Sequence, residues 1–217
     1  MDFQPNETQS RILELSRTFV RECVEPEARA WDRDAEIPEA FLERMARQGF
    51  LGMVIPPEFG GSGIDPVGYV LALMEIAAAS PALGLVMSIN NQVGDTILRV
   101  ATQAQKERVL PDLVSGGCFG SIALTEPQAG SNVTAIQTSA KKVDGGYVLN
   151  GKKVYVSNGA YRGIALVCAR TSDDRRRGLT FFLVDKDAEG ARREPMERTL
   201  GLRATSMTVH HFTDCFV

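Results

Sequence analysis

The hydrophobic periodicity of this chain changes once, near Gly116-Gly117, and this change constrains the fold more than any other feature. Before it, apolar residues recur at the spacing of a helix face. After it, they form short runs or alternate with polar residues, as in strands. With 217 residues the chain can form one or two domains with a substantial core. We therefore predict a helical domain over residues 1–116 and a β domain over residues 117–217.

The N-terminal part is predicted to form a helical bundle. Asn6 and Gln9 have the spacing of a capping box and begin a helix that runs to about Ala30. The helix that begins near Pro66 is apolar on almost every side, so we expect it to be buried within the bundle. Residues 50–65 are rich in glycine and proline and are expected to form an ordered loop. Further helices are predicted to begin near Pro38, Pro81 and Gln103.

The C-terminal part is predicted to form a small β domain. Asp144-Gly145-Gly146 and Asn150-Gly151 have the composition of hairpin turns. Several short strands with such turns are typical of an antiparallel barrel or sandwich. The predicted fold class is therefore α+β, an N-terminal all-α helical bundle followed by a small antiparallel β-barrel or sandwich. The expected strands cover residues 119–124, 136–143, 147–149, 154–157, 164–169, 179–184 and 207–217.

Composition argues against several classes of function. A net charge of −3 and the lack of a dominant basic face give no electrostatic reason to expect nucleic-acid binding. The cysteines lie far apart, which favours free thiols in a reducing compartment over a zinc site, and no metal is expected. No signal peptide or membrane-spanning run is visible. We expect a cytoplasmic protein without membrane insertion, or a mitochondrial matrix protein if a transit peptide has been removed.

The only two histidines, His210 and His211, are adjacent in an expected strand. Successive side chains of a strand point to opposite faces, so the pair is poorly arranged to act together. We therefore favour surface residues of an edge strand over a metal ligand or a general base.

Residues 121–132 have the character of a ligand-binding segment. They begin as an apolar run, stop at Pro127, and continue with small and hydroxylic residues. Backbone N–H groups around Gly130 and Ser131 can face an anion such as a pyrophosphate. The Thr125 hydroxyl can bond a heteroatom of a planar ring.

Residues 151–158 form a second segment of this kind. Tyr155 and Ser157 are two positions apart, so they lie on one face of a strand. Tyr155 can cover the face of a planar ring while Ser157 bonds its edge. Alternatively, Thr125 and Ser157 are ordinary strand hydroxyls and Tyr155 belongs to the core.

Both segments match motifs of one known family. Residues 123–132 read Ala-Leu-Thr-Glu-Pro-Gln-Ala-Gly-Ser-Asn, close to the family pattern Thr/Ser-Glu-Pro-x-x-Ala-Gly-Ser-Asp. Residues 149–159 read Leu-Asn-Gly-Lys-Lys-Val-Tyr-Val-Ser-Asn-Gly, and the family pattern is Leu-Asn-Gly-x-Lys-x-aromatic-Ile/Val-Thr/Ser-Asn-Gly. Residues 105–111 and 201–206 resemble two further family segments. In this order and spacing, the chain from about Glu7 to its end resembles the acyl-CoA dehydrogenase family.

The resemblance implies an FAD site built in part from the first motif. It places Ile122, Leu124 and Thr125 along the flavin, with Thr125 hydrogen-bonded to the pyrimidine part of the ring. It places Gly130 and Ser131 close to the cofactor. Ser131 is also available to the nucleotide tail of an acyl-CoA substrate, which makes it the expected substrate-binding residue.

The second motif supplies the other cofactor-binding residues in this comparison. Tyr155 takes the position usually held by tryptophan against the flavin, and Ser157 lies near the hydride-accepting N5. Val156, between them, belongs to the same set. The helix over residues 83–97 walls part of the acyl pocket.

The chain departs from the family pattern in two places. Asn132 stands where aspartate is usual, and the loop is expected to keep its shape without the charge. The sequence ends at Val217, where the family continues with a helical domain that carries the base glutamate. No catalytic base is therefore expected among these residues. Glu126 lies inside the first motif, but its family position is structural.

The expected activity is oxidation of an acyl-CoA thioester to the 2-enoyl-CoA. A C-terminal partner chain or an oligomer would complete the site, and an electron-transfer flavoprotein would accept the electrons. Two alternatives remain open on the same scaffold. One is a non-catalytic structural subunit, and the other is a flavin oxidase or monooxygenase.

Overall fold

The computed structural model of the chain describes residues 4–175, 177–196 and 199–217. It separates into two compact units. One consists of Met1–Gly117 with Thr199–Thr205, and the other of Cys118–Arg198 with Ser206–Val217. A short stretch late in the sequence thus belongs to the helical unit, and no hydrophobic period marks it.

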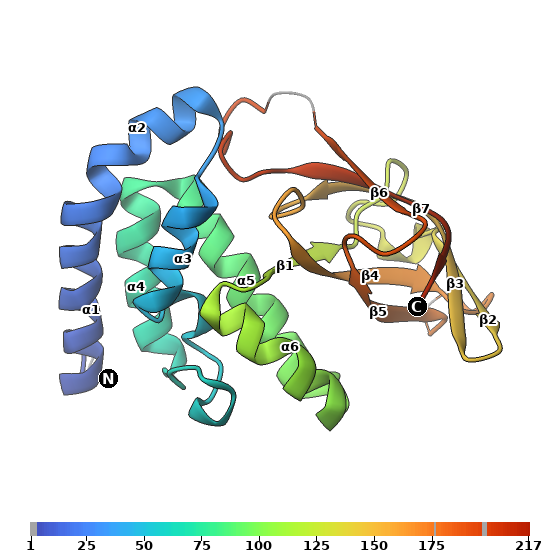
Figure 1. Cartoon of the computed structure of the whole chain (residues 1–217), viewed down its shortest axis with the longest axis horizontal. Coiled ribbons are helices and arrows are strands. Elements are labelled where there is room, and N and C mark those ends of the chain that lie inside the picture. Colours follow the sequence, from blue (N-terminus) through green and yellow to red (C-terminus); the bar gives the residue numbers. More distant parts are fainter. Residues whose placement is uncertain (1–3, 176, 197–198) are drawn as a thin grey trace. The chain divides into compact units, whose positions relative to one another are not determined.

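The helical unit contains α1 (Glu7–Phe19), α2 (Glu25–Asp34), α3 (Glu39–Arg47), α4 (Pro66–Ala79), α5 (Pro81–Val100) and α6 (Gln103–Ser115) (Figure 1). The capping box at the start of α1 is confirmed, because Asn6 Oδ1 accepts from Gln9 N at 2.9 Å and Gln9 Oε1 accepts from Asn6 N at 3.0 Å. The single helix expected up to Ala30 is wrong in one respect. A π-helical turn, Val20–Val24, separates α1 from α2. Periodicity alone does not mark such a turn, since it inserts one residue without a proline or glycine.

The loop over residues 50–65 is ordered, as expected, and contains the 3₁₀ turns Phe50–Gly52 and Pro57–Phe59. Two buried amides on α5 hold its backbone. Asn90 Nδ2 donates to Leu51 O at 3.0 Å, and Asn91 Nδ2 donates to Phe50 O at 2.8 Å. These bonds supply partners to buried loop carbonyls that no helix or strand would satisfy.

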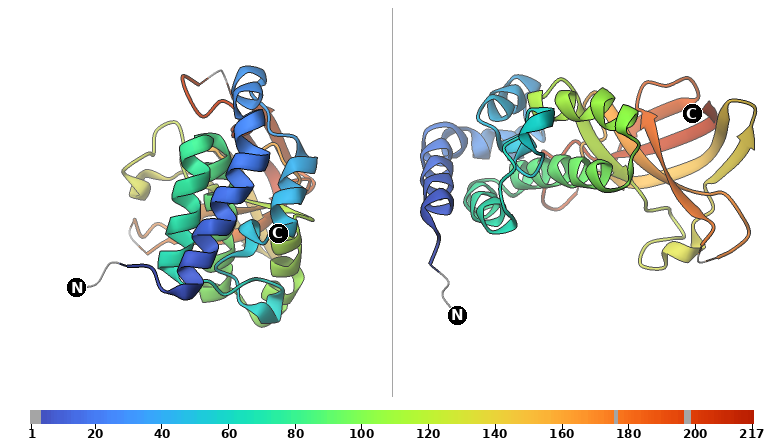
Figure 2. Two further views of the ribbon diagram at one scale, coloured as in Figure 1. Left: turned by 90° about the vertical axis from the view of Figure 1, so that its left-hand side faces the viewer. Right: turned by 90° about the horizontal axis from the view of Figure 1, so that it is seen from below.

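Helix α4 is less buried than its composition predicts. Gly68, Ala72 and Ile76 are its buried residues, and α1 lies along α4 (Figure 2). Val67 and Met74, in contrast, are 55% and 64% exposed. Full burial was therefore the wrong expectation. An apolar helix is buried only on the sides that neighbouring elements cover, and within this unit that is one stripe.

The second unit is a curled seven-stranded sheet with strand order β1-β4-β2-β3-β7-β6, and β5 pairs with β4 (Figures 1 and 2). Helices followed by a small β domain confirm the predicted fold class. The sheet is mixed rather than purely antiparallel, because β1 runs parallel to β4. The strands are β1 (Phe119–Ala123), β2 (Ser139–Val143), β3 (Gly146–Val156), β4 (Gly163–Arg170), β5 (Leu179–Asp185), β6 (Ala191–Pro195) and β7 (Thr208–Phe216).

Strand β3 replaces two shorter strands that were expected on either side of a turn at Asn150-Gly151. That turn is wrong, whereas the turn at Asp144-Gly145-Gly146 between β2 and β3 is confirmed. At Gly151 the pairing with β7 shifts register. A Cβ atom on Gly151 would lie 2.4 Å from Thr138 Oγ1. The glycine therefore permits a close backbone approach inside a strand instead of a chain reversal.

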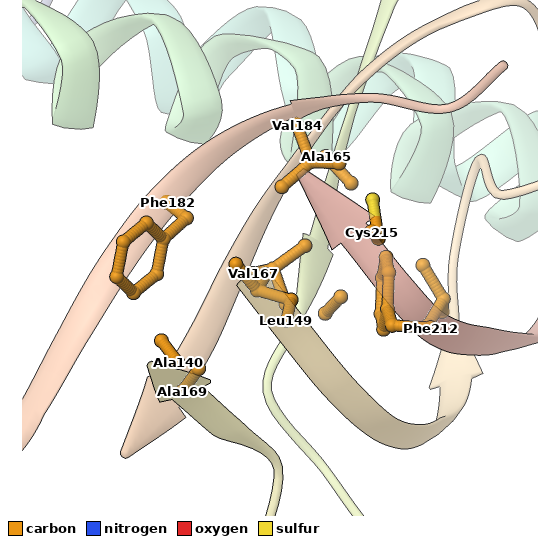
Figure 3. Packing of buried hydrophobic residues seen from close by; sticks show 11 residues of the cluster. Ala140, Leu149, Ala165, Val167, Ala169, Phe182, Val184, Phe212 and Cys215 are labelled. Atoms are coloured by element: carbon orange, nitrogen blue, oxygen red, sulfur yellow. The ribbon is translucent and has the colours of Figure 1, made fainter. Parts of the chain in front are cut away.

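The inner face of the sheet forms the core of this unit. Leu149 of β3, Val167 of β4, Val184 of β5 and Phe212 of β7 point toward one another in Figure 3. Burying each such side chain contributes about 1.5–3 kcal/mol relative to leaving it in water. The core thereby fixes the ends of β1 and β3, where the two motifs lie.

Candidate active site

The two motifs are joined directly by their backbones. Just beyond the end of β1, Thr125 O accepts a hydrogen bond of 2.9 Å from Val154 N of β3. A second hydrogen bond joins the two motif regions, from Asn158 Nδ2 to Gly120 O at 3.2 Å. These hydrogen bonds hold the segment after β1 and the end of β3 next to each other.

A buried ion pair locks this junction. Lys153 Nζ lies 2.7 Å from Glu126 Oε1, and the two side chains are 0% and 2% exposed. The same ammonium group donates to Leu124 O at 3.0 Å. Lys153 belongs to the second motif, and the motif alone assigns it no role. Only its place in an alternating apolar pattern indicates that its side chain is buried. A lysine that points inward from a strand must meet a buried acceptor.

The Glu126 carboxylate is fully engaged. It accepts hydrogen bonds from Thr138 N at 2.9 Å, Gln137 N at 2.7 Å and Gln128 Nε2 at 2.6 Å. Burial would raise the pKa of Glu126, but the bonds from Lys153, Thr138 and Gln137 outweigh burial and lower this pKa to about 2. A carboxylate that holds its charge so firmly is a poor proton acceptor. Its role is to tie the loop after β1 to the chain before β2.

The loop that begins at Glu126 makes a tight turn and then opens to solvent. Glu126 N and Ala129 N each donate to the other's carbonyl oxygen at 3.0 Å. Gly130 and Ser131 follow and are exposed, and a Cβ atom on Gly130 would meet nothing within 4 Å. Asn132 Oδ1 accepts from Thr134 Oγ1 at 2.7 Å, so the asparagine supports the loop as an acceptor, without the usual aspartate charge.

The remaining predicted residues of the first motif are half-buried. Ile122, Leu124 and Thr125 each keep part of their surface accessible. Leu124 also packs against a small buried cluster that contains Ala129, Ile136 and Cys168. One edge of Leu124 is thus available to a ligand while the rest of the side chain is committed to packing.

In the second motif, Ser157 is half-buried and Val156 is fully buried in the core. Only the backbone of Val156 can therefore contact a cofactor. Tyr155 lies between Val154 and Val156 in a bulge of β3, with φ of 58° and 60% of its surface exposed. The alternative that Tyr155 belongs to the core is therefore wrong. A bulky residue held with positive φ and turned to solvent is unusual, and such residues cluster at functional sites.

The histidines differ from their expected positions. Strand β7 lies between β3 and β6, so it is not an edge strand, and the surface interpretation is wrong for His210, which is 2% exposed. Burial, with the nearby charges of Lys186 and Arg193, lowers the pKa of His210 to about 4. His211 Nε2 lies 2.8 Å from Glu194 Oε1.

The part of the chain that the structure describes contains neither a metal-binding cluster nor a membrane-spanning helix. Residues 4–175, 177–196 and 199–217 contain no group of three or more His, Cys, Asp or Glu side chains that could hold a metal ion. Within the same ranges, every helix is too short or too polar to cross a membrane. The four cysteines are free thiols.

Comparison with known proteins places both units in one family. Residues 6–117 match the family model described as acyl-CoA dehydrogenase, N-terminal domain, and residues 121–215 match the middle domain of the same family. An acyl-CoA dehydrogenase of Bacillus subtilis (strain 168) is 35% identical over 93% of this chain and 54% of its own length. The chain thus spans about half the length of the curated relatives it matches.

Solved structures give the same result. The butyryl-CoA dehydrogenase of Megasphaera elsdenii superposes with a TM-score of 0.92 at 29% identity, over 100% of this chain and 58% of that one. A glutaryl-CoA dehydrogenase from Mycobacterium smegmatis in complex with FADH2 gives 0.92 at 29% identity, over 98% of this chain and 54% of that one. With both motifs, both units and both family models in agreement, the chain belongs to the acyl-CoA dehydrogenase family.

Proposed function

We propose that this chain forms the flavin-binding side of an enzyme that oxidises an acyl-CoA thioester to the 2-enoyl-CoA. The observation that carries the proposal is the hydrogen bond between Val154 N and Thr125 O, which sets the two motifs side by side. A non-catalytic subunit would have no need for an exposed aromatic residue held with positive φ beside that junction.

The donor set at the junction fits FAD. Half-buried Ile122 and Leu124 offer apolar surface to a planar ring, while the hydroxyls of Thr125 and Ser157 suit the polar edge of that ring. Tyr155 supplies an exposed aromatic face. When bound, FAD supplies the acceptor for two electrons and the β-hydrogen of the substrate, which leaves as hydride. The relative solved with FADH2 supports this choice of cofactor.

The residues of this chain bind and orient the flavin and the acyl-CoA. Thr125 and Ser157 would hold the ring edge by hydrogen bonds, and the backbone of Val156, next to Ser157, would contact the same cofactor. Gly130 and Ser131, on the exposed loop, are free to approach the cofactor, and Ser131 can also reach the nucleotide part of acyl-CoA. The Glu126–Lys153 pair keeps both motifs in register and takes no part in proton transfer.

The reaction also needs a base that removes the α-proton of the thioester. Glu126 is unsuited because it is buried, fully hydrogen-bonded and firmly ionised. We assign the base to a carboxylate outside these 217 residues, on another segment or another chain. An electron-transfer flavoprotein is the proposed electron acceptor.

The experiment uses the protein purified with any C-terminal partner, under anaerobic conditions. Flavin absorbance near the visible maximum is recorded before and after addition of a short-chain and a medium-chain acyl-CoA. We expect bound flavin that loses its absorbance on substrate addition, and weaker flavin binding in Thr125→Ala and Ser157→Ala. Protein that binds no FAD would overturn the proposal in favour of a structural subunit. Flavin reduced by acyl-CoA and reoxidised at once by air would redirect it to an oxidase.

A further inference from the structure

The segment of residues 158–161 directly follows Ser157 and has an unusual set of backbone partners. Lys186 Nζ donates to Asn158 O at 2.8 Å and to Tyr161 O at 3.0 Å. Arg193 Nη1 lies 3.2 Å from Gly159 O and 3.3 Å from Ala160 O. Four successive carbonyl oxygens are therefore bound by two cationic side chains.

Lys186 is buried, with 2% of its surface exposed. Its third hydrogen bond goes to Phe119 O, at 2.9 Å, at the start of β1. The three N–H groups of an ammonium match these three acceptors, which a neutral amine cannot all satisfy. Burial, together with the smaller effect of the Arg193 charge, lowers the pKa of Lys186 to about 7. These three short hydrogen bonds make the buried Lys186 side chain a tether between the start of β1 and residues 158–161.

Arg193 reaches the same segment from β6. Its Nη1 also contacts Tyr161 O at 3.3 Å, and its Nη2 pairs with Asp187. Strand β6 is hydrogen-bonded to β7 along its length, so the backbone that carries the Arg193 guanidinium group is fixed by the sheet. The two cations thus approach the segment from the β5–β6 connection and from β6.

The segment lies between β3 and β4, outside the strand ladders of the described ranges, and side chains bind its carbonyl oxygens there. Asn158 has φ of 58°, so the chain turns sharply immediately after Ser157. Ala160 N is bonded to Ser206 O at 3.1 Å, which secures the other side of the backbone. Polar backbone groups at a buried turn must be paired, and here side-chain cations do so.

We propose that Lys186 and Arg193 are positioning residues for the hydride-accepting site: they clamp residues 158–161 and so hold the Ser157 hydroxyl against the flavin ring. The inference rests on the proposed function. Neither side chain needs to touch cofactor or substrate. Their effect passes through the backbone from Asn158 to Ser157, one peptide unit away.

The test compares the holoprotein with Lys186→Met, which keeps an unbranched stem and removes the charge, and with Arg193→Lys, which keeps the charge and loses donors. Lys141→Met is the control, since Lys141 is an exposed residue of β2. Hydrogen exchange of the amides of residues 157–162 is measured without flavin. Flavin affinity and the rate of anaerobic flavin reduction at saturating acyl-CoA are measured with it.

In Lys186→Met we expect exchange in this segment to rise, flavin affinity to fall by about tenfold, and the reduction rate to fall with little change in KM. Arg193→Lys should show the same pattern more weakly, and Lys141→Met should match wild type. If Lys186→Met does not fold, Arg193→Lys carries the test.

Two outcomes separate this inference from the function on which it rests. Wild-type protein that binds no flavin overturns both. Wild-type protein that is reduced by acyl-CoA, with variants that keep its flavin affinity, spectrum and reduction rate, overturns the clamp alone.

Discussion

Lys153 and Glu126 form an ion pair of 2.7 Å whose side chains are 0% and 2% exposed. One partner lies in each motif, and 26 residues separate them in the sequence. A buried pair is weak evidence for net stability, because both charges lose their hydration. It does specify how the two segments are positioned, because any arrangement that left one buried charge unpaired would be strongly destabilised. The pair therefore sets the register between the loop after β1 and the end of β3.

The effects of removing Glu126 and of removing Lys153 on stability should be strongly coupled. We expect Glu126→Gln and Lys153→Met each to lower the free energy of unfolding by about 3–5 kcal/mol, because each leaves a buried charge uncompensated. The double variant should lose clearly less free energy of unfolding than the two single variants lose together. Denaturant unfolding of the three proteins measures the coupling.

The control is Glu7–Arg11, an ion pair of 2.6 Å whose side chains are 80% and 79% exposed. Removing it should change stability by less than about 1 kcal/mol. Equal effects at the two pairs, or additive effects at Glu126 and Lys153, would contradict the locking role.

Acid should remove the contribution of Glu126 in a defined interval of pH. The pKa of this carboxyl is about 2 in the folded chain against an ordinary value of 4.5. Between pH 2 and 4.5 the carboxyl binds more protons in the unfolded chain than in the folded chain. The stabilisation that ionised Glu126 provides is therefore fully present above pH 4.5 and is lost as the pH falls through 2. The lost contribution is about 3 kcal/mol. The stability difference between wild type and Glu126→Gln should therefore shrink as the pH falls; a difference constant with pH would refute this.

Tyr155 should show a conflict between stability and binding. Its φ of 58° is costly for a bulky residue, by about 1–3 kcal/mol. In Tyr155→Gly we expect the flavin-free protein to be at least as stable as wild type in thermal unfolding, while flavin affinity falls. Ala35→Gly, at another residue with φ of 58° at the end of α2, should stabilise without affecting flavin. Loss of stability in Tyr155→Gly with flavin affinity retained would mean that the tyrosine is structural.

Replacement by alanine should destabilise the protein at one glycine and leave its stability unchanged at another. At Gly151 a Cβ atom would lie 2.7 Å from Thr138 Cα, so Gly151→Ala should destabilise the sheet by about 1–3 kcal/mol. At Gly130 the added atom meets nothing within 4 Å, so Gly130→Ala should leave thermal stability near that of wild type. Similar melting temperatures for both variants would show that the close approach at Gly151 is relaxed at little cost.

Sequence reasoning worked where local chemistry decides structure. The capping box at Asn6 and the turn at Gly145 depend on residues close in the chain, and both were predicted. It failed where distant segments decide. Asn150-Gly151 has turn composition, yet pairing with β7 keeps it inside a strand. β7 is an inner strand because β6 pairs with it, and the polar sequence of β6 carries no sign of a strand. His210 is surrounded by Gly159, Lys186 and Arg193, which come from distant parts of the sequence.

The candidate site was predicted in part. Both motifs were identified, and the structure joins them at Thr125 and Val154. Their supports were missed, because Lys153 and Lys186 look like ordinary surface lysines until the fold supplies carbonyl and carboxylate partners for them. Only the alternation along β3 indicates burial of Lys153, and Lys186, just after β5, has no such local signal.

The central claim is that the Thr125–Val154 junction binds a flavin that accepts hydride from an acyl-CoA. Its most direct test is the absorbance of the purified protein, with any C-terminal partner, during anaerobic titration with acyl-CoA. We predict a flavin spectrum that bleaches in proportion to added thioester and is weakened in Thr125→Ala. A colourless protein that neither takes up added FAD nor responds to acyl-CoA would contradict the account.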